Sequence, residues 1–203
     1  MINVLLLGAT GTFGSALAKK LIADSECHVT LFARTTNSIK MNKPNVTVMS
    51  GDAANAEQLK MAVKGQDVVY CAISGNQLPI IAENLVSVID ECNVSRLLFM
   101  GAVGIYNELP AGNGAEYNVD NEPEQIPNRQ AVDVIEKSNL NYTVLRPGFL
   151  QDGNENDYVL TVKGETPSGY TTTIPSVVKL AIELIHNDEL FSKESVSITK
   201  KAL

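Results

Sequence analysis

The feature that most constrains this chain is a glycine-rich turn, Gly8-Ala-Thr-Gly11-Thr-Phe-Gly14, placed directly between an apolar run and an amphipathic run. Each glycine has a physical task in that position. Gly8 permits a tight turn out of a strand, Gly11 lets backbone amides approach a bound anion, and Gly14 lets the following helix pack closely on the strand. Free amides at a helix N-terminus, together with the helix dipole, bind phosphate. The turn therefore predicts a site for the pyrophosphate of a dinucleotide; the alternative is a glycine-rich βα turn that binds nothing.

Short β-rich apolar runs alternate with runs whose apolar residues recur every three or four positions. The first kind predicts strands at Ile2–Leu7, Val29–Ala33, Val46–Met49, Asp67–Cys71, Arg96–Met100 and Tyr142–Leu145. The second kind predicts helices at Phe13–Ala23, Ala56–Val63, Gln77–Glu91 and Ile126–Lys137. Parallel strands joined by right-handed helical crossovers accommodate this alternation. We expect an α/β fold, a Rossmann-type doubly wound parallel sheet with helices on both faces.

The residues after Pro147 are too few for a second full domain. We therefore expect residues 1–203 to form a single NAD(P)-binding Rossmann domain. Within it, residues 148–203 are expected to form a small C-terminal cap on the substrate side, with a helix over Pro175–His186 and a strand over Ser195–Thr199.

Charge and cysteine content exclude several classes of function. A net charge of −7 opposes binding to nucleic acid, which needs clustered Lys and Arg. The apolar run Leu97–Ile105 is far shorter than the roughly 18 to 20 residues of a membrane helix. Three cysteines without a C-x-x-C spacing suggest neither a disulfide framework nor a zinc site. We expect a cytoplasmic monomer or homodimer that binds no nucleic acid, membrane or metal.

The identity of the dinucleotide is normally read at the end of the second strand. An Asp or Glu there would bind the ribose 2′-hydroxyl of NAD, but this chain has Arg34-Thr35-Thr36. The Arg34 guanidinium suits a 2′-phosphate, and Thr35 can add a hydroxyl donor. NADP(H) is therefore favoured over NAD(H); the alternative is an ordinary surface arginine.

The stretch from Gly101 to Pro127 is the least regular part of the chain and predicts a long functional loop. Tyr106 in it is the one candidate for a catalytic side chain, through stacking or its hydroxyl; the alternative is an anchor packed on the sheet edge. Arg146 could clamp a substrate or tie the C-terminal segment. His28 and His186 are not expected to act as metal ligands or as acids and bases.

Four features together indicate a family: the Gly8–Gly14 turn, Asp52 after the third strand, the long loop after the fifth, and Tyr142-Thr-Val-Leu-Arg146-Pro147-Gly148. The chain resembles the atypical short-chain dehydrogenase/reductase family of NAD(P)H-binding proteins, close to NADH-flavin reductases and biliverdin IXβ/flavin reductases. The resemblance implies that Asp52 and Ala53 border the adenine, although Asp52 could equally be a turn residue. It further implies that Cys71 to Ile73 border the ribose and phosphates, that Gly101 to Val103 approach the nicotinamide, and that Pro147 to Leu150 close its far side. The cofactor-binding set is thus predicted as Gly8, Thr10, Gly11, Thr12, Phe13, Gly14, Arg34, Thr35, Asp52, Ala53, Cys71, Ala72, Ile73, Gly101, Ala102 and Pro147.

The chain departs from the wider superfamily in its proton donors. Reductases of that superfamily use a Ser or Thr after the fifth strand and a Tyr-x-x-x-Lys on the next helix. Here the corresponding positions fall near Gly101 or Ala102, Gln125 and Arg129. Glutamine has no proton to donate at a tuned pKa and arginine stays charged, so standard carbonyl reduction is in doubt.

Flavin reduction needs no such donor, because hydride can pass between stacked rings and solvent can supply the proton. We therefore expect an NADPH-dependent oxidoreductase whose substrate is FMN, FAD or another flavin-like or quinone-like small aromatic acceptor. The alternative is a non-catalytic NADP(H)-binding redox sensor. A nucleotide-sugar dehydratase or epimerase is a weaker third hypothesis.

Overall fold

A computed structural model describes residues 1–37, 39 and 43–200 of the chain. Its main sheet has eight strands in the order β3-β2-β1-β4-β5-β6-β10-β8. All neighbouring pairs are parallel except β8, which runs antiparallel to β10. The strands are β1 (Ile2–Leu7), β2 (Cys27–Ala33), β3 (Val46–Ser50), β4 (Val68–Cys71), β5 (Arg96–Met100), β6 (Tyr142–Pro147), β8 (Val159–Val162) and β10 (Glu194–Thr199). From β1 the chain adds β2 and β3 on one side of the sheet, and it adds β4 and the later strands on the other side of β1. The strand order reverses between β1 and β4, which leaves a crevice at the carboxyl ends of these two strands.

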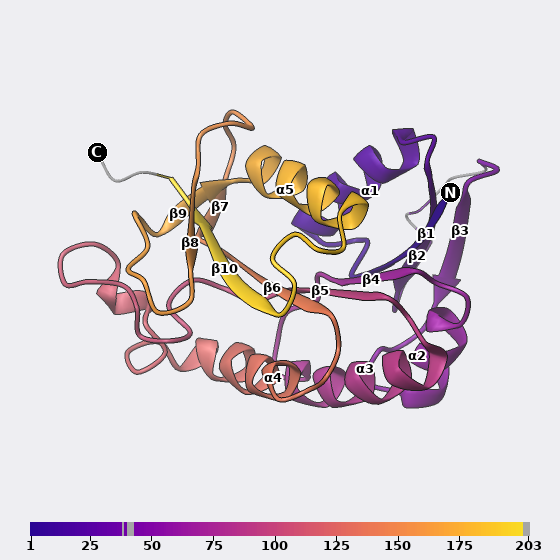
Figure 1. Cartoon of the computed structure of the whole chain (residues 1–203), viewed down its shortest axis with the longest axis horizontal. Coiled ribbons are helices and arrows are strands. Elements are labelled where there is room, and N and C mark those ends of the chain that lie inside the picture. The colour runs from indigo at the N-terminus through magenta and orange to yellow at the C-terminus, as the bar shows by residue number, and fades with distance from the viewer. Residues whose placement is uncertain (38, 40–42, 201–203) are drawn as a thin grey trace.

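Helices cover both faces of the sheet, as Figure 1 shows. α1 (Thr12–Ala23) and α5 (Ile174–His186) lie on one face, and α2 (Ala56–Val63), α3 (Leu78–Cys92) and α4 (Ile126–Glu136) lie on the other. The sheet has a hydrophobic core on each face, and alternate residues of β1 point into one or the other. Leu5 and Leu7 belong to the core under α2–α4, and Val4 and Leu6 belong to the core under α1 and α5. Burial on both faces explains why central strands such as β4 and β5 are nearly continuous apolar runs. The expected doubly wound fold is confirmed.

The C-terminal segment differs from the expected cap. The strand β10 pairs with β6 and carries β8 at its outer edge, so most of this segment extends the main sheet. Only β7 (Phe149–Gln151) and β9 (Thr171–Thr173) pair outside that sheet. β7, β8 and β9 have three or four residues each, too few for a period-two pattern to stand out in the sequence. Residues 201–203 of the segment lie outside the described residues.

The loop after β5 is more ordered than its sequence suggests. It contains two short 3-10 helices, η1 (Ala115–Tyr117) and η2 (Pro123–Gln125). The Asn118 side chain accepts a hydrogen bond from the Leu109 amide and donates one to the Leu109 carbonyl. The amide of Val119 donates to the carbonyl of Gly104, whose φ of +94° suits glycine. The loop is therefore a hydrogen-bonded structure whose two ends lie beside the site described next.

Candidate functional site

The turn between β1 and α1 requires glycine at two of its three glycine positions, Gly8 and Gly14. Gly8 has a φ of +83°, and a Cβ there would lie 2.8 Å from the carbonyl oxygen of Ala72. A Cβ on Gly14 would lie only 2.1 Å from the carbonyl oxygen of Gly8. Gly14 thus fulfils the predicted role of letting α1 approach β1, and Gly8 brings the turn against the end of β4.

The start of α1 offers free amides to an anion. Gly11 is the N-cap, and its own N–H donates to the carbonyl of Gly8 at 3.0 Å, so it is not free. The N–H groups of Thr12, Phe13 and Gly14 make no hydrogen bond to another described residue. These three donors lie at the positive end of the helix dipole, where a phosphate binds favourably.

A cavity of about 390 Å³ lies at the carboxyl ends of β1 to β4. The predicted cofactor residues that line it are Gly8, Thr10, Gly11, Arg34, Asp52, Ala53, Ala72 and Ile73. Sequence reasoning missed Phe32, Ala33, Gly51, Ser74, Gly75, Asn76, Gln77 and Ile81, which complete its wall. Half of these belong to the polar loop after β4, whose residue types are common in any loop and carry no signature of their own.

The two predicted recognition residues of this cavity behave differently. Arg34 is exposed at its wall, with its charge accessible to a phosphate. One carboxylate oxygen of Asp52 accepts a hydrogen bond from the Ala54 amide at 3.0 Å, and the Asp52 amide donates to the Gln58 side chain at 2.8 Å. Asp52 is therefore a turn residue that also lines the cavity.

A second cavity of about 540 Å³ continues from the first toward β5 and β6. Gly11, Ala72, Ile73 and Ser74 line both, which makes the two cavities neighbours along the carboxyl edge of the sheet. The rest of its wall is Thr12, Phe13, Met100, Gly101, Ala102, Val103, Gln125, Asn128, Pro147, Gly148, Phe149 and Leu150. It thus brings together the predicted residues after β5 and those from Pro147 to Leu150.

The wall of the second cavity carries no Asp, Glu, His, Lys, Cys or Tyr side chain among the residues that line it. Gln125 donates to the Val103 carbonyl at 3.2 Å, and Asn128 donates to the Gln125 side chain at 3.1 Å. Arg129 forms a 2.7 Å ion pair with Asp133 on its own helix. The Gln125 and Asn128 side chains in this part of the wall therefore present amide groups.

Three predicted cofactor residues, Gly14, Thr35 and Cys71, line neither cavity. Gly14 acts through packing, as described above, and Thr35 is exposed beyond the wall. Cys71 is fully buried, and burial raises the pKa of its thiol to about 12. Its small apolar side chain belongs to the core under α2–α4.

Tyr106, the candidate catalytic residue, also lines neither cavity. Its hydroxyl lies 2.7 Å from a carboxylate oxygen of Glu136 and 3.0 Å from the hydroxyl of Ser195. Burial raises its pKa, which makes it a poorer acid. Three cationic groups lie 4.5 to 4.9 Å from its ring centre: Arg129, Arg146 and Lys163. The structure places Tyr106 as the loop anchor of the alternative reading.

Arg146 ties the elements around this anchor. It is fully buried; its Nε donates to the Ser195 hydroxyl at 3.0 Å, and a terminal nitrogen pairs with Glu108. The same Glu108 carboxylate accepts hydrogen bonds from the amides of Gly104 and Tyr106. Arg146 therefore joins β6 to β10 and to the loop after β5, and it is absent from both cavity walls, where a substrate clamp would be.

Comparison with known proteins agrees with this geometry. Residues 8–188 match the model of a family described as NAD(P)H-binding. The chain belongs to this NAD(P)H-binding family. A search of curated proteins gave no match.

Solved structures extend the family assignment. A Rossmann-fold NAD(P)-binding family protein from Shigella flexneri is 33% identical, with 98% of this chain and 94% of that one covered and a TM-score of 0.84. A short-chain dehydrogenase/reductase from Veillonella parvula in complex with NADP is 25% identical over 98% and 94% of the two chains, with a TM-score of 0.87. ChuY, an anaerobilin reductase from Escherichia coli, shares the fold at 20% identity, with 99% and 98% covered and a TM-score of 0.83. Within the described residues, no helix is long and apolar enough to span a membrane.

Proposed function

We propose that this member of the NAD(P)H-binding family is an NADPH-dependent oxidoreductase that passes hydride to a flavin or to a flavin-like or quinone-like aromatic acceptor. The observation that carries the proposal is the second cavity. It adjoins the glycine turn, it has room for a ring system beside a nicotinamide, and its wall offers apolar and amide groups without a titratable proton donor. Hydride transfer between stacked rings is compatible with such a wall, because the protein supplies orientation and solvent supplies the proton.

The cofactor is proposed to lie across both cavities. Its adenosine half would occupy the first cavity, with Asp52 and Ala53 beside the adenine and the exposed Arg34 beside the 2′-phosphate. Its pyrophosphate would meet the free amides of Thr12 and Phe13, and its nicotinamide would enter the second cavity. The relative from Veillonella parvula with NADP bound supports this cofactor.

Phe149 is proposed to stack on the acceptor. Its side chain remains half exposed at the cavity wall, although a phenyl ring gains by burial. Its ring meets the Tyr117 ring edge-on, with 4.4 Å between the ring centroids, and the Tyr117 and Tyr170 ring centroids lie 5.5 Å apart. The exposed ring is therefore held in place by aromatic neighbours, and a planar acceptor that covered it would gain apolar contact. That one structural neighbour is an anaerobilin reductase makes anaerobilin a further acceptor to test.

The sensor alternative is disfavoured by volume. A protein that only senses NADP(H) needs no space beside the nicotinamide, whereas the second cavity, of about 540 Å³, would hold the nicotinamide and an acceptor ring together. Dehydratase or epimerase chemistry is disfavoured, because the Tyr and Lys that it needs would fall near Gln125 and Arg129 in this chain.

The test is a fluorescence titration of the purified chain with NADPH and with NADH, followed by addition of FMN, FAD, a soluble quinone and anaerobilin to the tighter complex. We expect NADPH to bind more tightly and at least one acceptor to cause loss of reduced-nicotinamide absorbance. Phe149→Ala should lower this turnover while the Kd for NADPH stays unchanged, and Ile80→Ala, an exposed apolar side chain on α3 outside both cavities, serves as the matched control. Tight NADPH binding without oxidation by any acceptor would shift the assignment to a sensor.

A further inference from the structure

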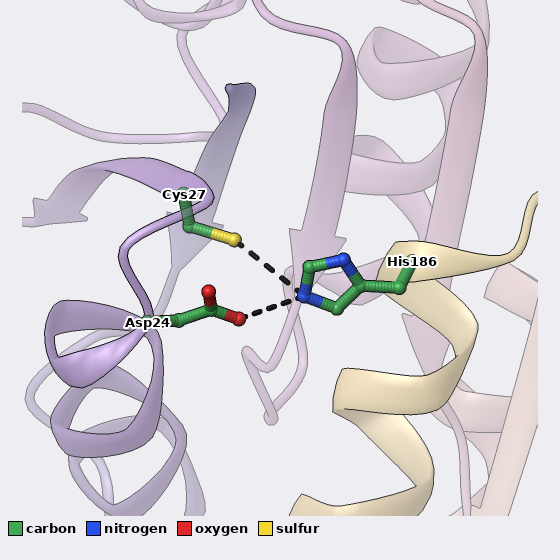
Figure 2. A group of neighbouring side chains, drawn as sticks. All are labelled: Asp24, Cys27 and His186. Carbon is green, nitrogen blue, oxygen red and sulfur yellow. Dashed lines mark hydrogen bonds and ion pairs between the residues drawn. The ribbon is translucent and has the colours of Figure 1, made fainter.

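Three metal-ligating side chains meet at the end of α1 that is remote from the glycine turn. Asp24 ends α1, Cys27 begins β2, and His186 ends α5. Figure 2 shows the Asp24 carboxylate and the Cys27 sulfur both directed at one nitrogen of the His186 ring. That nitrogen, Nε2, lies 2.7 Å from Asp24 Oδ2 and 4.0 Å from Cys27 Sγ. All three donor atoms lie within 4.8 Å of one another.

We propose that Asp24, Cys27 and His186 form a binding site for a divalent transition-metal ion of the zinc class. A thiolate, an imidazole and a carboxylate are the ligands that zinc takes in proteins, and three of them leave a fourth position for water. Sulfur and imidazole nitrogen are poor ligands for Mg²⁺ and Ca²⁺, which prefer oxygen. A thiolate and a carboxylate together also balance the charge of a dication.

The arrangement needs little change to accept the ion. In a tetrahedral zinc site with bonds of about 2.0 Å to nitrogen and oxygen and about 2.3 Å to sulfur, neighbouring donor atoms lie roughly 3.3 to 3.6 Å apart. The Nε2–Oδ2 separation of 2.7 Å must therefore widen and the Nε2–Sγ separation of 4.0 Å must shorten, each by about half an ångström. Small side-chain rotations provide such shifts, and the third separation, between the donor atoms of Asp24 and Cys27, is no more than 4.8 Å.

The surroundings of the cluster orient its ligands. The Glu26 amide donates to Asp24 Oδ1 at 2.9 Å, which leaves Oδ2 directed at His186. A carboxylate oxygen of Glu26, whose side chain is 77% exposed, lies 3.8 Å from His186 Nδ1, the nitrogen that would not bind metal, and has to move closer to accept a hydrogen bond from it. Metal-binding histidines commonly donate that second N–H to a carboxylate, which fixes the ring and its tautomer.

The cluster is reachable, although its sulfur is buried. The Asp24 and His186 side chains are 21% and 28% exposed, which gives an ion a path from solvent. Cys27 itself is fully buried, and burial raises the pKa of its thiol to about 11. Metal binding must therefore displace the thiol proton, a cost that the charge of the ion offsets.

The site would act on stability and not on cofactor binding. α1 has 12 residues, which corresponds to about 18 Å between its two ends. The cluster therefore lies far from the amides at the start of α1, and none of its residues lines either cavity. An ion held there joins the ends of α1 and α5 and stabilises the folded chain, because the unfolded chain does not bring His186 to the other two ligands.

The experiment uses the full-length chain, stripped with a chelator and titrated with Co²⁺ as a spectroscopic probe and with Zn²⁺ by calorimetry. We expect one ion per chain, a cobalt–thiolate charge-transfer band that Zn²⁺ abolishes by displacement, and a higher Tm with Zn²⁺. Cys27→Ser should remove the band, and His186→Gln should lower the affinity for both ions by about 100-fold or more, since each deletes a ligand. Glu26→Gln should lower the affinity for both ions about tenfold.

Two matched controls separate the cluster from other cysteine and histidine side chains. Cys92→Ser changes a free cysteine outside the cluster, and His28→Gln changes the chain's other histidine, which pairs with Thr47. Both should bind Co²⁺ as the unaltered chain does, and NADPH affinity should be equal in all variants, as a check on folding. Absence of the thiolate band, or its persistence in Cys27→Ser, would show that the three side chains form an ion pair beside a buried thiol and no metal site. If Cys27→Ser does not fold, the variant of the exposed His186, His186→Gln, tests the metal site with the same charge-transfer band and the same titration.

Discussion

Replacing Gly11 by alanine should weaken cofactor binding without harming the fold. Gly11 has a φ of −71°, which any residue adopts, and a Cβ there would meet only the Gly8 carbonyl oxygen at an ordinary 3.4 Å. Alanine is a poorer N-cap than glycine, so the unfolding free energy should fall by at most about 1 kcal/mol. The new methyl group would stand in the wall shared by the two cavities, where the pyrophosphate has to approach the backbone. We expect the Kd for NADPH to rise about 10- to 100-fold, or roughly 1.4 to 2.7 kcal/mol.

Gly14→Ala is the contrasting substitution in the same turn. Its Cβ would lie 2.1 Å from the Gly8 carbonyl oxygen, so either the turn or α1 must move. Alanine gains about 1 kcal/mol over glycine inside a helix, but overpacking of this kind costs about 1 to 3 kcal/mol and sometimes more. The overlap here is with rigid backbone, so we expect the unfolding free energy to fall by about 2 kcal/mol or more.

The assay for both variants is urea unfolding without cofactor, followed by fluorescence titration with NADPH. The reasoning predicts opposite profiles: Gly11→Ala stable and weakly binding, Gly14→Ala unstable. A Gly11→Ala protein that binds NADPH as tightly as the unaltered chain would refute the placement of the pyrophosphate. A Gly14→Ala protein of unchanged stability would refute the close approach of α1 to the turn.

Three further predictions concern other parts of the molecule. Arg34→Ala should raise the Kd for NADPH about tenfold and leave that for NADH unchanged, as measured by parallel titrations; equal losses would remove the case for a 2′-phosphate partner. Arg146→Met leaves the Glu108 carboxylate buried without its cationic partner and should lower the unfolding free energy by about 3 to 5 kcal/mol. Adding Glu108→Gln should restore part of that free energy in a double-mutant cycle. If the losses of the two single variants simply add, Arg146 and Glu108 are not coupled. Burial raises the Cys71 pKa from 9.0 to about 12, so this thiol contributes stability that is complete below pH 9 and is lost as pH rises toward 12. Cys71→Ala should therefore flatten the alkaline fall of stability, by up to about 1.4 kcal/mol per pH unit, relative to Cys92→Ala; an unchanged slope would contradict this.

Much of the fold could be predicted from the sequence because most strands and helices are long enough for their hydrophobic patterns to be recognised. The first six strands and the helices between them are runs of four residues or more, most of them buried on one or both faces, and their patterns predict them within a few residues. β7 and β9, with three residues each, lack that length, and β8, with four, only just reaches it. Thr171–Thr173 is a strand only because Phe149–Gln151 lies beside it, and this pairing is tertiary information. The helix and the late strand of the C-terminal segment were predicted, but the sequence did not indicate that β10 pairs directly with β6 and extends the main sheet.

The site was predictable where a residue type has a stated physical task. Gly8 and Gly11 of the tight turn, Arg34 after a strand and Asp52 after the next strand all line one cavity, whereas Gly14 acts through packing. The loop from Ser74 to Gln77 contributes as much wall, but any small polar residue would serve there and none is distinctive. Tyr106 shows the opposite error. An aromatic hydroxyl in a loop near a site looks functional, yet its contacts with Glu136 and Ser195 show that it anchors the loop.

The cluster of Asp24, Cys27 and His186 marks the limit of reading metal sites from spacing. The rule that asks for paired cysteines is local, and the sequence has no such pair. Asp24 and Cys27 are only three positions apart, but that spacing also describes an ordinary helix end followed by a strand. His186 is 159 residues beyond Cys27 and comes to it only because α5 packs beside α1 on the same face of the sheet. Ligands joined by helix packing rather than by sequence leave no spacing to find, so a negative result from such rules excludes local sites alone.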